Sequence, residues 1–123
     1  LATVRGDKGG MVLVDAAEMA ALVARLPAPP VLAPGGSAAN VVRVAAQLGG
    51  LRAGFLGKLG ADATAQAYRA QTEALGVDLT RCLATTAAPT ARSLILITPD
   101  AARTMRTDLG AADEDPVRGS VLA

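Results

Sequence analysis

The residues best suited to chemistry in this chain lie in one stretch, residues 33–49, which reads APGGSAANVVRVAAQLG. Gly35 and Gly36 lead into a helical pattern, and Asn40 falls on the first turn of the expected helix. The first N–H groups of a helix lack intrahelical partners, and glycines before them let a polar ligand approach. An amide side chain both donates and accepts, which suits a pair of sugar hydroxyls. The stretch therefore predicts a polyol site, the alternative being a tight strand-to-helix turn capped by Ser37.

Common catalytic and phosphate-binding motifs are missing from the chain. No Gly-Lys-Ser/Thr follows the stretch, as a P-loop requires, and GGSAAN lacks the third glycine and the distant acidic residue of the dinucleotide-binding fingerprint. The missing fingerprint argues against a Rossmann-like oxidoreductase half. The chain has no histidine, which excludes a Ser-His-Asp triad and the usual zinc motifs within it.

Three charged residues are further candidates. Lys58 and Asp62 belong to GKLGAD, a glycine loop expected between a strand and a helix, and open α/β sheets bind ligands beside such loops. The main role predicted for Asp62 is a helix N-cap, and Lys58 is otherwise a solvated charge. Arg103 follows a turn at 99–101 and could reach an anion, the alternative being a solvated charge that protects an edge strand.

Composition narrows the class of protein. The 123 residues form one domain or part of one, and a net charge of +1 with one Tyr, one Phe and no Trp argues against nucleic-acid binding. No apolar run reaches the roughly 18 residues of a membrane span, so no membrane partner is expected. The single cysteine, Cys82, cannot form an internal disulfide, which favours a reducing, cytoplasmic location and a small apolar role for its side chain.

The helices and strands that must position these residues are predicted from the spacing of apolar residues and from the residues that start and end each element. We expect a strand at 11–14 and a helix over 15–26, capped by Asp15 and packed through a stripe from Met19 to Leu26. The helix after Ser37 carries a second stripe, and a further helix starts at Asp62. The expected stripe of the helix after Ser37 consists of Val41, Val44, Ala45 and Leu48. Strands are expected at 51–56 and within 77–85, and two antiparallel strands over 91–107. Strands alternating with helices indicate an α/β fold with a parallel sheet, and the antiparallel pair indicates a flap.

The motifs KGGMVLVD, GGSAANVVRVAAQLGG, GKLGAD, PTARSLILITPDAARTM and LGAA, in that order, resemble the PfkB (ribokinase-like) family of carbohydrate and nucleoside kinases. The branch labelled adenosine kinase or sugar kinase matches best, from about residue 8 onward. The resemblance implies a partial Rossmann-like αβα core with a small β lid. Residues 1–123 would be the N-terminal part of one kinase domain. Lid strands are expected at about 10–14, 31–34 and 91–107, and core elements at about 15–26, 38–79 and 117–123.

The resemblance also implies roles for individual residues. Gly35, Gly36 and Asn40 would line the sugar or ribose site, and Lys58 would border it. Ser93 and Leu94 would be lid residues facing the substrate, and Arg103 would be the lid arginine that approaches the transferred phosphate. The reaction implied moves the γ-phosphate of ATP, with Mg²⁺, to a primary hydroxyl of a sugar or nucleoside, and two lids could pair in a homodimer.

The chain departs from the family pattern at several points. Ala65 and Ala101 stand where, or near where, members usually have glycine, which makes both loops less permissive because alanine avoids positive φ. The strand whose aspartate clamps sugar hydroxyls, the Gly-Ala-Gly-Asp segment with the catalytic base, and the adenine and Mg²⁺ sites have no counterpart. We therefore expect an incomplete enzyme that is inactive alone. The alternative is a non-catalytic binding or lid-dimerisation module.

Overall fold

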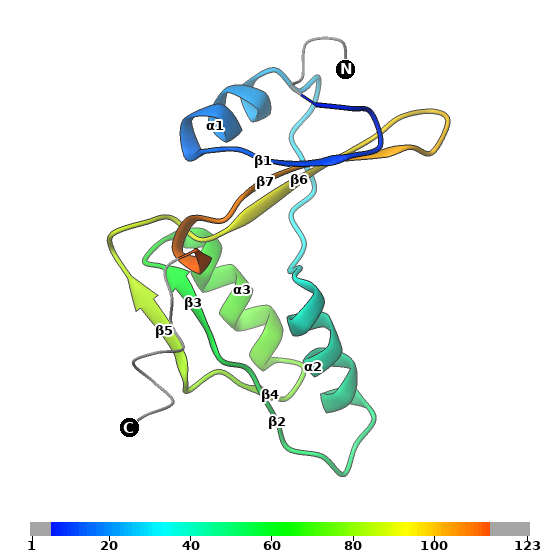
Figure 1. Cartoon of the computed structure of the whole chain (residues 1–123). Helices are drawn as coiled ribbons and strands as arrows, with labels where there is room; N and C mark the ends of the chain where they lie inside the picture. The colour runs from blue at the N-terminus through cyan, green and yellow to red at the C-terminus, as the bar shows by residue number, and fades with distance from the viewer. Residues whose placement is uncertain (1–5, 114–123) are drawn as a thin grey trace. The chain divides into compact units, whose positions relative to one another are not determined.

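The computed structural model describes residues 6–113, which divide into two compact units (Figure 1). The first, here called the sheet unit, contains the described residues up to Val31 together with Ala91–Gly110. The second, here called the helix unit, contains Leu32–Thr90 and the described residues from Ala111 onward. The fold class is mixed α/β, as the sequence predicts.

The sheet unit is built on a three-stranded sheet of order β1-β7-β6 (Figure 1). Its strands are β1 (Met11–Leu13), β6 (Arg92–Ile97) and β7 (Arg103–Asp108). β6 and β7 form the expected antiparallel hairpin, in which Ile97 is opposite Arg103. β1 runs parallel to β7 and lies on its other side, so a segment near the start of the chain completes a sheet begun by the hairpin.

Helix α1 (Ala16–Ala24) packs on one face of this sheet. Asp15 caps it as predicted, because its carboxylate accepts from the backbone N–H of Glu18 at 2.8 Å. The predicted stripe is also confirmed: Met19 is buried with Leu94, and Leu22, Val23 and Leu26 pack against them. Residues 15–26, expected among the core elements, lie in the sheet unit, where this helix buries its apolar face on the three-stranded sheet.

The other face of the sheet is exposed and largely apolar. Successive strand residues point to opposite faces of the sheet, and the register aligns these faces across β1, β6 and β7. The side chains that do not point toward α1 make up this second face. Its exposed large apolar residues are Met11, Leu13, Ile95 and Ile97.

The helix unit combines two helices with short parallel strand pairs (Figure 1). In chain order its elements are α2 (Ser37–Gln47), β2 (Ala53–Gly54), β3 (Gly57–Gly60), α3 (Ala63–Glu73), β4 (Val77–Asp78) and β5 (Cys82–Thr85), with the 3₁₀ turn η1 (Gly110–Ala112) at the border of the units. β2 pairs with β4 and β3 with β5, both in parallel. The parallel pairing predicted from the alternation of strands and helices is confirmed.

The core of the helix unit forms where α3 covers these strands. Its buried members are Leu59, Ala65, Val77, Leu79 and Cys82, and the partly buried Val42, Ala46, Phe55 and Tyr68 pack against them. The cap predicted at Asp62 is confirmed, because its Oδ1 accepts from the Ala65 N–H at 2.8 Å.

Several local expectations were wrong. Residues 31–34 form no strand, the strand expected over 51–56 shrinks to β2, and the loop expected at 57–62 begins as β3. The stripe expected to bury α2 is also wrong: Val41, Val44 and Leu48 are exposed, whereas Ala39 is buried. The core element expected at 117–123 lies outside the described residues.

Candidate functional site

The mouth of α2 is open, unlike those of α1 and α3. Gly36, and not the predicted Ser37, is the N-cap, and no side chain makes a capping hydrogen bond there. Gly36 has φ +101°, a conformation that disfavours any residue with a Cβ, and its carbonyl accepts the first helical bond from the Asn40 N–H at 2.8 Å. The N–H groups of the first turn and the positive end of the dipole are therefore presented without a covering side chain.

The conformation that requires glycine at position 36 does not occur at Gly35. It does not have positive φ, and a Cβ built on it would meet no atom within 4 Å. A Cβ at Gly36 would make only an ordinary 3.7 Å contact with Ala39, so its requirement for glycine comes from the backbone. Gly35 thus leaves open space beside the helix mouth that neither packing nor backbone conformation requires.

Arg43, which sequence reasoning missed, organises this mouth. Its Nη1 donates to the Pro34 carbonyl at 3.1 Å and to Asn40 Oδ1 at 3.2 Å, so it ties the glycine loop to the first turns of the helix. Because the oxygen of the exposed Asn40 amide is engaged, its NH₂ group is the better placed to donate to a ligand. The available signal was the spacing of Asn40 and Arg43 on one helix face.

Lys58 lies in β3, not in the loop where it was expected. It pairs in register with Leu83 of β5, is half-buried, and already has an interaction within the fold. The structure therefore places Lys58 within strand β3.

A second feature missed by the sequence is the polar node of Gly60, Asp62 and Thr90. The buried Thr90 hydroxyl donates to Asp62 Oδ1 at 2.7 Å and accepts from the Gly60 N–H at 3.0 Å, while the Thr90 N–H donates to Asp62 Oδ2 at 2.8 Å. A Cβ on Gly60 would come within 2.5 Å of the Thr90 backbone nitrogen, so close approach requires glycine there. The node fixes the backbone just before the hairpin begins.

In the sheet unit, Ser93 and Leu94 cannot both face one ligand. Successive strand residues point to opposite faces. Leu94 is buried beneath α1 with Met19, which corrects the expectation that it faces a substrate. Ser93 is exposed, and its Oγ lies 2.9 Å from the Thr107 hydroxyl on β7.

Arg103 is exposed at the first position of β7, on the face away from α1. Arg106 lies on the opposite face, as alternation predicts, and is completely buried. Its Nη1 donates to the Met105 carbonyl at 2.7 Å, while Nε and Nη2 have no hydrogen-bond partner among the described residues. Arg103 is therefore the arginine of this strand that a solute can reach.

Burial raises the pKa of Tyr68 and the charge of Arg43 partly opposes this rise, so one group with perturbed ionisation lies within electrostatic reach of the mouth of α2. Burial raises the pKa of the Cys82 thiol, opposed by the charge of Arg69. Hydrogen bonds from Lys8, and then from Thr98, lower the pKa of Asp100 at the turn of the hairpin. The cysteine is buried, as its apolar role predicts.

Within 6–113, no group of three or more His, Cys, Asp or Glu side chains lies in an arrangement able to hold a metal ion. The same part of the chain contains no helix with the length and apolar character needed to cross a membrane.

Comparison with known proteins identifies the family. The sequence model of the family described as "pfkB family carbohydrate kinase" matches residues 11–118. The chain belongs to the pfkB family. Both units contribute to the match, from β1 through the hairpin, and the resemblance predicted from the motifs is confirmed. No curated protein matches the chain.

Solved structures of pfkB-type kinases share this fold. Adenosine kinase from Sinorhizobium meliloti is 39% identical with a TM-score of 0.75, and the match covers 88% of this chain and 32% of that one. A probable sugar kinase from Rhizobium etli CFN 42 is 37% identical with a TM-score of 0.74, covering 86% and 32%. The chain thus spans about a third of the length of these proteins, and its fold is the ribokinase-like fold over that part.

Proposed function

We propose that the chain is the acceptor-binding part of an ATP-dependent kinase that phosphorylates a primary hydroxyl of a sugar or nucleoside. The open mouth of α2 carries the proposal, because it presents backbone N–H groups and an oriented amide to a polyol. Similarity at 39% and 37% identity to an adenosine kinase and a probable sugar kinase supports the same acceptor classes.

Within this proposal each candidate residue has one task. Gly35 and Gly36 keep side chains out of the acceptor's place, and Asn40 donates to an acceptor hydroxyl while Arg43 holds its oxygen. Arg103 supplies positive charge to the transferred phosphate, since phosphoryl transfer depends on positioning and charge stabilisation. Ser93 is retained as a lid residue that contacts the acceptor, and Lys58 as a residue that borders its site.

We propose further that the catalytic base, the nucleotide site and the residues that hold Mg²⁺ come from sequence outside this segment, in a cytoplasmic enzyme. Two facts support this origin of the base and the nucleotide site: Gly-Ala-Gly-Asp does not occur in the chain, and the matches cover 32% of the adenosine kinase and 32% of the probable sugar kinase. ATP would supply the phosphoryl group and Mg²⁺ would neutralise its charge. The 123-residue chain alone should release no ADP above a buffer blank.

The test is a coupled ADP-release assay on a complete kinase that carries this segment, with ribose, fructose and adenosine in turn. Asn40→Ala should lower acceptor kcat/KM about three- to tenfold and leave the KM for ATP unchanged, because one hydrogen bond to the acceptor is lost. Gly35→Ala should also weaken binding of the acceptor, because its methyl group would occupy space proposed for the acceptor. It should leave the stability of the fold unchanged, since a Cβ at this position meets no protein atom within 4 Å.

Gly36→Ala is the matched control for Gly35→Ala. It should cost about 1–2 kcal/mol of stability, because alanine resists φ +101°. If Gly35→Ala and Asn40→Ala both leave acceptor kcat/KM unchanged, the mouth of α2 is a structural turn and the proposed site is wrong.

Pairing of two copies through the sheet unit is a second candidate, favoured by the exposed apolar face of Met11, Leu13, Ile95 and Ile97. A contiguous exposed apolar patch is typical of a protein–protein interface. Sedimentation of the chain should then show a dimer that Ile97→Lys dissociates. A monomer at all accessible concentrations would refute the pairing.

A further inference from the structure

The turn between β6 and β7 is held in a conformation that its own sequence disfavours. Ala101 has φ +61°, a left-handed conformation that residues other than glycine disfavour. Two backbone bonds close the turn, from the Thr98 N–H to the Ala102 carbonyl at 3.1 Å and from the Ala101 N–H to the Thr98 carbonyl at 2.8 Å. The Thr98 hydroxyl donates to Asp100 Oδ1 at 2.6 Å. Such a turn benefits from contacts outside the hairpin.

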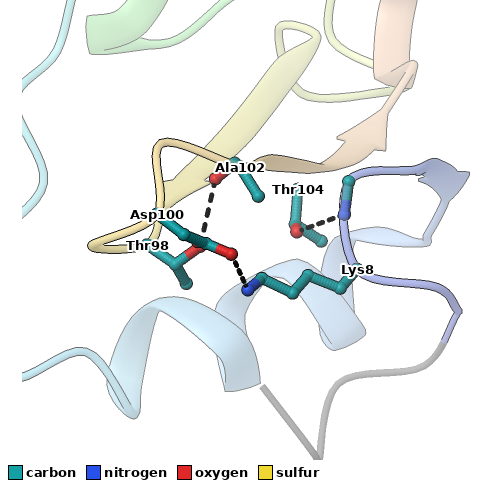
Figure 2. Close-up of polar contacts among 6 residues, drawn as sticks. Lys8, Thr98, Asp100, Ala102 and Thr104 are labelled. Carbon is teal, nitrogen blue, oxygen red and sulfur yellow. Dashed lines mark hydrogen bonds and ion pairs between the residues drawn. The ribbon is translucent and has the colours of Figure 1, made fainter.

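The segment before β1 supplies those contacts. Lys8 Nζ forms an ion pair with Asp100 Oδ2, and the Gly9 N–H donates to the Thr104 hydroxyl at 2.9 Å, as Figure 2 shows. The Gly10 carbonyl then accepts from the Met105 N–H at 2.9 Å. Three consecutive residues thus contact the hairpin at the turn and at the start of β7.

These contacts bracket Arg103. Asp100 is held on one side of it in the sequence, and Thr104 and Met105 on the other. Arg103 itself is exposed, so its direction depends on the backbone that carries it. Lys8 fixes the turn by charge, whereas Gly9 and Gly10 fix the strand by hydrogen bonds of their backbone groups.

We propose that Lys8 and Asp100 form a positioning pair, which fixes the turn of the hairpin and thereby the direction of Arg103. The proposal rests on the proposed kinase function, in which Arg103 serves the transferred phosphate. Both side chains are about half exposed, at 47% and 57%, and an ion pair of that kind contributes little to global stability. Its signature is therefore a change in turnover that is larger than any change in stability.

The test uses single and double variants of a complete kinase that carries this segment. Lys8→Met and Asp100→Asn should each lower kcat about three- to tenfold, because a small displacement of a catalytic group is costly, while acceptor KM moves less than about twofold. The double variant should be no worse than either single, and Lys8→Arg should restore most of kcat. Asp7→Asn, an exposed acid-to-amide change beside Lys8, is the matched control and should keep the full rate.

A second measurement follows the turn without catalysis. In the 123-residue chain, hydrogen exchange at the Ala101 amide should quicken about two- to fivefold in Asp100→Asn. Exchange at the Met105 amide, which bonds to Gly10, should change less. Unchanged exchange at Ala101 would overturn the proposal, because the pair would then not hold the turn.

Combining these variants with Arg103→Gln separates the two proposals. If the pair acts through Arg103, Asp100→Asn adds no further loss to Arg103→Gln. If Arg103→Gln lowers kcat and Asp100→Asn does not, the positioning pair is refuted while the proposed kinase role stands. If Arg103→Gln leaves kcat unchanged, the role of Arg103 is refuted, and the positioning proposal is refuted with it.

Discussion

Thr90→Val tests the most connected polar node of the helix unit. Valine keeps the shape of threonine and the backbone N–H that donates to Asp62 Oδ2. It removes the hydroxyl that donates to Asp62 Oδ1 at 2.7 Å and accepts from the Gly60 N–H at 3.0 Å. Thr90 is only 4% exposed, so water cannot readily replace either bond.

The expected cost follows from these two bonds. A hydrogen bond to a charged group contributes about 1.5–3 kcal/mol, and a buried N–H left unpaired costs about 1–3 kcal/mol. Because the node relaxes as a unit, the two terms overlap, and we expect a loss of about 3 kcal/mol. With a urea m-value of about 1.5 kcal/mol/M, the unfolding midpoint should fall by about 2 M.

Urea unfolding of the 123-residue chain measures this loss directly. Thr90→Ser keeps the hydroxyl and should lose about 1 kcal/mol, the contribution of one buried methyl group. Thr86→Val, on the exposed part of the same loop, should stay within about 0.5 kcal/mol of the parent chain. A Thr90→Val unfolding midpoint equal to that of Thr86→Val would refute the argument that the two hydrogen bonds of the Thr90 hydroxyl stabilise the fold.

Two further predictions concern stability at single positions. Ala101→Gly should stabilise the chain by up to about 1 kcal/mol in urea unfolding, because it relieves φ +61°, whereas Ala102→Gly, without positive φ, should destabilise it. Burial raises the pKa of Cys82 above its ordinary value of 9.0, so the folded state favours the neutral thiol. The stability from this group is present below the unfolded pKa and is lost as pH rises through the folded pKa. Urea midpoints should therefore fall above about pH 9, less steeply in Cys82→Ala, and an identical pH slope in both chains would count against this cause.

The features that the sequence predicted well depend on near neighbours. Asp15 and Asp62 cap their helices through N–H groups three residues away, so the pattern and the contact lie in the same short segment. The stripe of α1 was predicted correctly because one sheet face covers it. The hairpin was found from two apolar runs and the turn between them.

The features that it missed depend on distant partners or on a single dihedral angle. Thr90 forms hydrogen bonds with Asp62 and Gly60, which lie 28 and 30 positions earlier, and the sequence around Thr90 contains no pattern that predicts these bonds. The sequence predicts that Ala65 and Ala101, where or near where glycine is usual, make both loops less permissive. Ala65 lies within α3, where alanine is favourable, and only Ala101 has positive φ.

The apolar stripe of α2 shows where periodicity alone misleads. The pattern correctly predicts the helix, but the buried and partly buried face of α2 contains Ala39, Val42 and Ala46. Val41 and Val44, on the stripe that the pattern favoured, are 70% and 58% exposed, and nothing within residues 6–113 buries them. Apolar residues at helical spacing identify a face suited to packing without saying which partner covers it.

The starts of α1, α2 and α3, compared with one another, give the strongest argument about function. α1 and α3 each begin at an aspartate whose carboxylate accepts a backbone N–H, which is the economical solution when a helix start has only to be stable. α2 begins instead at a glycine with φ +101°, preceded by Gly35, whose missing Cβ faces open space. A carboxylate at that point would occupy the N–H groups and the positive end of the dipole. Within residues 6–113, side chains therefore close the starts of α1 and α3 and leave open the start of α2, which carries an oriented amide on its first turn.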